Sequence, residues 1–403
     1  MICERMRQAR LMRGLSLQEA VRRLGVVGAP LTRAGLSKYE RGGSTPSASL
    51  LLRLAKVLGV RAEYFLEEPT AVIQWVAFRS HANMSERARD RVRALAGNAV
   101  EARVWLQETL HPNAKACLPA PGKAHSTADA EGAAAKLRQK WNLGRGPVEG
   151  LAQVIEDRGG IVCAFPEKEG DFDGLCGRAN TCYPVVVVNS DMPDDRRRFS
   201  MAHELGHLMM DCRAIPPKEE EKLANRFAGA FLVPPEVARQ ELGDKRKRLD
   251  IEELKLLKTK HGLSMLGWVH RAYDLDIIDK GHLNSLYKLF SSRGWRKTEP
   301  IAYVGQETPT RMKQMALRAV AEGIITPDRA EALCPGCVPS DENATLAPGA
   351  VNMTAIEVMR LPPPERERVL AEAALQAERE YRSNKDLTAF EAFGKEEPAD
   401  EPA

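Results

Sequence analysis

The sequence of 403 residues lacks any long hydrophobic segment, since it contains no run of eighteen uncharged apolar residues. A transmembrane helix needs about 20 such residues, so no membrane span is predicted. The N-terminal residues, MICERMRQAR, are charged where a secretory signal would have its apolar core. We therefore expect a cytoplasmic protein that has no membrane association.

Cysteine is also scarce, with eight residues spread along the chain and none of the density of a disulfide scaffold. We therefore expect reduced thiols. Cys334 and Cys337 form a single CPGC motif, and no second pair of metal ligands lies near it in the sequence. A proline-glycine turn that holds two thiols is favoured over a metal or redox site.

The two ends of the chain carry opposite charge, which the net charge of +4 conceals. Residues 1–68 hold twelve Lys and Arg against six Asp and Glu, a net charge of +6. Residues 338–403 hold seven bases against fourteen acids, a net charge of −7. The basic end is the one suited to nucleic acid, and the acidic end argues against such a partner.

The length predicts two or three domains, and the first 66 residues form short helical patterns separated by glycine. One of them, SLQEAVRRLG, opens with Ser16 as a predicted N-cap, has Glu19 in the capping-box position and closes at Gly25. Thr32 starts the next, TRAGLSKYERGG, in which Leu36 and Tyr39 are spaced to face a core. The residues then left on its outer face are Arg33, Ala34, Ser37 and Lys38.

This pattern, with SLQEA, LSKYERG and PSASLLLRLAKVLGV as its parts, resembles the XRE-type (Cro/repressor) helix-turn-helix family over residues 1–68. The resemblance implies an operator in double-stranded DNA as a partner, with the helix after the central turn in the major groove. The N-terminus of that helix can bind phosphate, and Arg33 and Lys38 could reach guanine. The predicted DNA-binding residues are Thr32, Arg33, Ala34, Ser37 and Lys38. The alternative is a small basic domain whose charges are merely solvated.

Residues 69–128 are predicted to connect two domains. A long helix from Met84 or Ser85 ends before Pro112, and it either joins domains or contributes to a possible homodimer. Residues 112–128 are rich in Pro, Ala and Gly without a periodic pattern, which predicts a linker.

Residues 129–300 alternate helices and strands. We predict strands at IVCAF and YPVVVVNSD, the second buried on both faces, with an irregular segment, DFDGLCGRAN, between them. A helix follows at DDRRRFSMAHELGHLMM, and another, KEEEKLANRFAGAFLVPP, is terminated by Pro234 and Pro235.

The stretch FSMAHELGHLMMDC, residues 199–212, contains an HExxH motif. Residues four apart share one helix face, so His203 and His207 can direct their imidazoles at one Zn²⁺. Glu204 lies about 100° round the helix, where it can accept a proton from a water molecule that the metal activates. The alternative is a buried helix that happens to contain two histidines.

A catalytic zinc site needs a third protein ligand, and the next helix offers three glutamates. Glu221 is favoured because it lies one turn before Asn225, on a face distinct from the apolar residues. For Glu219 and Glu220 we expect a solvated acidic first turn that suits the helix dipole.

The motif RRRFSMAHELGH followed by ExxANRFAxxFLVP resembles the ImmA/IrrE family of zinc metallopeptidases over about residues 130–300. The resemblance implies His203, His207 and Glu221 as ligands of Zn²⁺, the expected cofactor, and Glu204 as general base and acid. It also implies cleavage of helix-turn-helix repressor proteins, which derepresses stress, phage or mobile-element genes. An arginine among residues 196–198 could steady the oxyanion, although solvated or paired arginines are favoured there.

The predicted fold class is α+β, multidomain and mostly α. It comprises an all-α helix-turn-helix domain, a zincin-like metallopeptidase domain with a small sheet at 129–300, a helical extension at 301–338 and an acidic, partly disordered tail at 339–403. The tail weakly resembles small antitoxins through LPPPERERVLAEAA and LTAFEAF, against a plain solvated helix. Two functions stay open: a DNA-binding zinc metalloendopeptidase that cleaves a repressor or itself, or a non-proteolytic transcription factor or antitoxin that senses a ligand or partner.

Overall fold

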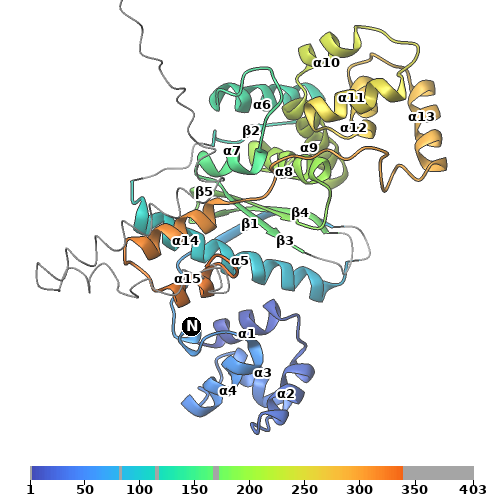
Figure 1. The fold of residues 1–403 in the computed structure, drawn as a ribbon. Helices are drawn as coiled ribbons and strands as arrows, with labels where there is room; N and C mark the ends of the chain where they lie inside the picture. The colour runs from blue at the N-terminus through green and yellow to red at the C-terminus, as the bar shows by residue number, and fades with distance from the viewer. Residues whose placement is uncertain (1, 81–83, 114–117, 167–171, 339–403) are drawn as a thin grey trace, which may run out of the picture. The chain divides into compact units, whose positions relative to one another are not determined.

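The computed structural model describes residues 2–80, 84–113, 118–166 and 172–338 of the chain (Figure 1). The chain divides into two compact units at the boundary between Cys337 and Val338. The predicted acidic tail, with its resemblance to antitoxins, lies outside the described residues. Within them, no helix is long and apolar enough to cross a membrane.

Short helices form the N-terminal domain, as predicted. Ser16 and Glu19 form the capping box: the Glu19 backbone N–H donates to Ser16 Oγ over 3.2 Å, and the Ser16 N–H donates to the Glu19 carboxylate over 2.7 Å. Leu36 is buried and Tyr39 packs against the same core, which confirms their predicted direction. The elements are α1 (Ile2–Met12), α2 (Leu17–Val26), α3 (Arg33–Glu40), α4 (Ala48–Leu58) and the 3-10 turn η1 (Ala62–Phe65).

The first compact unit also contains a second domain, C-terminal to these helices, with a four-stranded mixed sheet at its centre in the order β1-β4-β5-β3. β4 is antiparallel to both β1 and β5, and β3 is parallel to β5. The four valines of β5 have no exposed surface, so the prediction of a strand buried on both faces is confirmed. The strands are β1 (Ile73–Ser80), β3 (Ile161–Phe165), β4 (Phe172–Ala179) and β5 (Tyr183–Asn189).

The prediction of an irregular segment at DFDGLCGRAN is wrong, because its residues 172–179 form β4, an internal strand of the sheet. Its two glycines, which read as turn signals, are positions where neighbouring groups approach the backbone closely. A Cβ at Gly174 would lie 2.4 Å from the Glu204 carboxylate, and one at Gly177 would lie 2.7 Å from the Gln74 carbonyl oxygen.

Helices cover both faces of this sheet (Figure 1). The long helix α5 (Glu86–Leu110) begins after Ser85, as predicted, and packs Val92, Ala96 and Val100 against one face. The helix α8 (Asp194–Met209) packs Met201 and Leu205 against the other. The structure thus makes α5 a layer of the second domain, a role that the sequence does not indicate.

Of the remaining helices, those at Thr127–Lys140, Leu151–Asp157 and Pro217–Leu232 contact α8, whereas the one at Arg311–Ala321 contacts α5. The predicted linker 112–128 overlaps α6, which begins at Thr127 because Ser126 and Asp129 form a capping box. At the far end, the Cys337 N–H donates to the Cys334 carbonyl oxygen, so CPGC is a turn, as expected. The other elements are β2 (Gly122–Lys123), α6 (Thr127–Lys140), α7 (Leu151–Asp157), β6 (Met210–Asp211), α9 (Pro217–Leu232), α10 (Pro235–Leu242), α11 (Ile251–His261), α12 (Met265–Asp274), α13 (Lys280–Ser292), α14 (Arg311–Ala321) and α15 (Pro327–Leu333).

Candidate metal centre

The HExxH motif lies in the buried second half of α8. Asp194 and Asp195 in the first turn suit the positive end of the helix dipole, and every residue from Ser200 to Met209 is buried. His203 has no exposed surface and His207 is only 5% exposed. Both imidazoles are therefore held in place by the packing around them.

The helix α9 carries Glu221 and crosses close to α8. Gly206 permits this approach, because a Cβ there would lie 3.1 Å from the Phe227 ring. Pro217 occupies the first turn of α9, where the missing N–H costs no hydrogen bond. The close crossing brings the Glu221 carboxylate, which is 43% exposed, to the two imidazoles.

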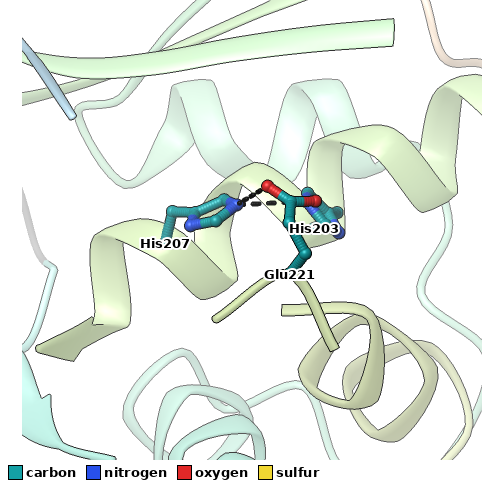
Figure 2. A group of neighbouring side chains, drawn as sticks. All are labelled: His203, His207 and Glu221. Carbon is teal, nitrogen blue, oxygen red and sulfur yellow. Dashed lines mark hydrogen bonds and ion pairs between the residues drawn. The ribbon is translucent and has the colours of Figure 1, made fainter. Parts of the chain in front are cut away.

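Three side chains converge on one point (Figure 2). The Nε2 atoms of His203 and His207 lie 3.1 Å apart. One Glu221 oxygen lies 3.4 Å from His203 Nε2, and the other lies 3.5 Å from His207 Nε2. Two ligand atoms at about 2.1 Å from a tetrahedral zinc ion are roughly 3.4 Å apart, so these three separations fit such an ion.

The opposite ring nitrogens are held by hydrogen bonds. His207 Nδ1 donates to the Glu220 carboxylate over 2.9 Å, and His203 Nδ1 donates to the Asn225 amide oxygen over 3.1 Å. In its neutral form each ring then carries its hydrogen on Nδ1 and turns Nε2 toward the site, as metal-binding histidines do. The expectation that Glu220 is merely solvated is therefore wrong, whereas Glu219 is exposed and pairs with Lys222.

The charges around the two imidazoles favour a cation. Burial lowers the pKa of His207, but hydrogen bonds to Glu220 and Glu221 and the nearby Glu204 charge outweigh it and raise this pKa to about 9. Hydrogen bonds with His203 and His207 in turn hold the pKa of the Glu221 carboxyl far below its usual value. A site that attracts a proton so strongly also attracts a metal ion.

Glu204 lies beside this cluster, fully buried against β4. Cys176, two residues beyond Gly174 in the same strand, is also fully buried. Burial, and after it the neighbouring Glu204 carboxylate, raise the pKa of the Cys176 thiol, so the thiol stays protonated beside that carboxylate. β4 therefore fixes the position of the Glu204 carboxylate.

Replacing Gly174 by alanine should displace the Glu204 carboxylate, because the new methyl carbon would overlap it. Displacement of a reacting group by about 1 Å costs roughly 100-fold in rate, so we expect any reaction in which Glu204 takes part to slow by about that factor. Zinc content and far-ultraviolet circular dichroism should stay unchanged. Gly132→Ala is the matched control, because a Cβ at Gly132 would have no neighbouring atom within 4 Å. Equal rates for the two variants would contradict the role of Gly174.

The three arginines at the start of α8 have separate surroundings. Arg198 has no exposed surface and donates to the Glu307 carboxylate over 2.5 Å, and Arg197 pairs with Asp194 over 3.1 Å. Paired arginines, the favoured expectation, are thus found at two of the three positions. Arg196 is exposed.

The outer face of α3 carries the predicted DNA-binding residues. Thr32, Arg33, Ala34 and Lys38 are exposed, whereas Ser37 is half-buried. Thr32 Oγ accepts the Gly35 N–H over 3.0 Å, so it caps the helix without using its own hydroxyl hydrogen. This face is therefore basic and accessible.

Two family models match the chain. Residues 157–273, which include the HExxH motif and Glu221, match the IrrE N-terminal-like domain of peptidase family M78. Residues 6–65, which include α3, match a helix-turn-helix domain. Both resemblances inferred from the sequence are confirmed. A search of the curated proteins gave no match.

Proposed function

Because this chain joins a helix-turn-helix domain to an IrrE N-terminal-like peptidase domain, we propose that it is a DNA-binding regulator and a zinc-dependent endopeptidase. Its substrate is a helix-turn-helix repressor, or another copy of this chain, and cleavage derepresses stress, phage or mobile-element genes. The observation that carries this proposal is the convergence of His203, His207 and Glu221 beside the buried Glu204.

His203, His207 and Glu221 are the proposed ligands of the zinc ion. When bound, zinc supplies Lewis-acid chemistry: it polarises a peptide carbonyl and makes water more acidic. The Glu204 carboxylate accepts a proton from the attacking water and delivers it to the nitrogen of the leaving amine. Burial of Glu204 keeps bulk water from competing for that proton.

The decisive test is cleavage of a natural substrate. Full-length protein loaded with one equivalent of zinc is incubated with the repressor encoded nearest to its gene, and the fragments are identified by mass spectrometry. We expect discrete fragments that disappear with a chelator and return with zinc. Promoter regulation that persists without any cleavage would favour the second candidate, a non-proteolytic regulator, because the DNA-binding domain belongs to the same chain.

For the DNA-binding half, we expect Arg33→Ala and Lys38→Ala each to weaken operator binding. Both cations stand exposed on α3. Loss of one phosphate contact should lower the slope of log affinity against log salt by about 1, whereas loss of a guanine contact should cost about 1–3 kcal/mol at one base position. Electrophoretic mobility shifts over a range of salt distinguish the two. Lys56→Ala, an exposed lysine of α4, is the control, and equal effects at all three positions would argue against α3 as the reading helix.

A further inference from the structure

An open pocket of about 390 Å³ lies along the first half of α8, the helix whose second half carries the HExxH motif. From α8 it is lined by Arg196, Phe199 and Ser200. At 3.6 residues per turn, these three residues fall on the helix face that also carries His203 and His207. The pocket therefore lies on the same face of α8 as the two histidines, nearer the start of the helix.

The spacing along α8 sets how far the pocket lies from the proposed reaction. Phe199 and Arg196 precede His203 by four and seven residues, which is roughly 6 and 10 Å along the helix at 1.5 Å per residue. An extended peptide advances about 3.3 Å per residue, so the pocket lies two to three substrate residues from the metal. Asp173 lines the pocket too, and it adjoins Gly174, which covers Glu204.

Four half-buried apolar side chains form the walls of the pocket. Phe199, Leu266, Trp295 and Ile301 all line it and pack against the main hydrophobic core behind it. The Trp295 ring is held edge-on against Phe290, with 5.6 Å between the ring centroids. Such walls suit a bulky apolar side chain.

A buried polar cluster fixes these walls. The Lys258 ammonium lies 2.9 Å from the Asp195 carboxylate and 2.8 Å from the Glu299 carboxylate. Glu299 also accepts the backbone N–H groups of Met265 and Leu266, over 3.0 and 3.1 Å. The segment that contains Trp295 and Ile301 is therefore anchored to α11 and α12, and a ligand does not have to order it.

The mouth of the pocket is positively charged. Arg196, Arg296 and Lys297 line it and are exposed, whereas Lys258 is paired with two buried acids, Asp195 and Glu299. Asp173 is the third acid on the lining, so the three exposed cations outnumber it. An acidic residue of a bound peptide would be attracted here, and a basic one repelled.

We propose that this pocket is a specificity subsite: it binds a bulky apolar side chain of the substrate, two to three residues from the cleaved bond, with an acidic residue beside it. The assignment rests on the proposed peptidase function. The proposed substrate class is therefore a peptide segment in which a bulky apolar residue and an acidic residue are neighbours.

The test measures binding and cleavage separately. Binding uses zinc-loaded full-length Glu204→Gln and two fluorescein-labelled glycine-serine octapeptides, one with a central Leu-Asp pair and one with Ser-Asn, followed by anisotropy. We expect about tenfold tighter binding of the Leu-Asp peptide. Leu266→Ala should reduce this preference at least threefold, whereas Leu256→Ala, which alters an exposed leucine of α11, should leave it unchanged.

Surface variants test the charged mouth without risk to folding. Lys297→Glu should weaken binding of the Leu-Asp peptide about tenfold and reduce its dependence on salt, whereas Lys247→Glu, at an exposed site outside the pocket lining, should not. Equal affinity for the two peptides, or equal effects of the pocket and control variants, overturns the subsite.

Cleavage of an equimolar decapeptide library by the wild-type protein completes the test. Enrichment of Leu, Ile or Phe two or three residues from the cut supports the subsite. Cleavage without that enrichment overturns the subsite and leaves the peptidase function standing. A binding preference without any cleavage overturns the peptidase function and leaves the pocket as a peptide-binding site.

Discussion

Glu204→Gln should lower the rate of repressor cleavage by about 10²- to 10⁴-fold, the usual contribution of a general acid-base group. Glutamine has nearly the shape of glutamate but cannot accept a proton from water. Glu204 is fully buried, so no bulk water reaches its position to act instead. The measurement is the initial rate of fragment formation, with the zinc-to-protein ratio determined on the same samples. That ratio should not change, because the proposed ligands are intact.

Glu219→Gln is the matched control for this substitution. Glu219 lies two residues before Glu221 on α9, but it is exposed and pairs only with Lys222 among the residues that the structure describes. Its loss should leave the rate within about twofold, since exposed ion pairs contribute little. Cleavage by Glu204→Gln at the wild-type rate would exclude Glu204 as the base. Normal promoter regulation by Glu204→Gln would exclude catalysis as the regulatory mechanism.

The spacing of residues in the sequence predicts the candidate metal ligands, but it does not predict the groups that surround them. His203 and His207 follow from helical geometry alone, and Glu221 follows from its place relative to Asn225 and the apolar face of its own helix. The hydrogen bond of Glu220 to His207 could not be predicted in this way, because it depends on how α8 crosses α9. The position of Glu220 in the first turn of α9 indicates an interaction with the helix dipole equally well.

The elements of the fold divide in the same way, into those that local sequence predicts and those that depend on tertiary contacts. The four valines of β5 are unambiguous, because only a strand with both faces buried suits so many consecutive apolar residues. β4 was not predicted, since Gly174 and Gly177 carry a turn signal whose cause is the close approach of Glu204 and of β1. The layer formed by α5 depends on the sheet that it covers, and its own sequence shows only a long helix.

Glu307→Gln should lower the free energy of unfolding by about 3–5 kcal/mol, the loss expected when one partner of a buried ion pair is removed. The Arg198 guanidinium donates to Glu307 and to the Val148 carbonyl oxygen, each over 2.5 Å, and neither charged side chain has exposed surface. Without the Glu307 charge, Arg198 keeps a buried and uncompensated charge five residues before His203. Urea unfolding followed by tryptophan fluorescence measures the loss.

Glu322→Gln removes the same kind of carboxylate charge from an exposed ion pair. The Arg318–Glu322 pair is as short, at 2.6 Å, but its side chains are 48% and 44% exposed, so we expect a loss below about 0.5 kcal/mol. A double replacement, Arg198→Met with Glu307→Leu, should recover most of the stability lost in Glu307→Gln, because no charge then stays buried. Similar losses in the two single variants would mean that water reaches Arg198. In that case α8 would be held in place by its apolar packing against the sheet and not by this ion pair.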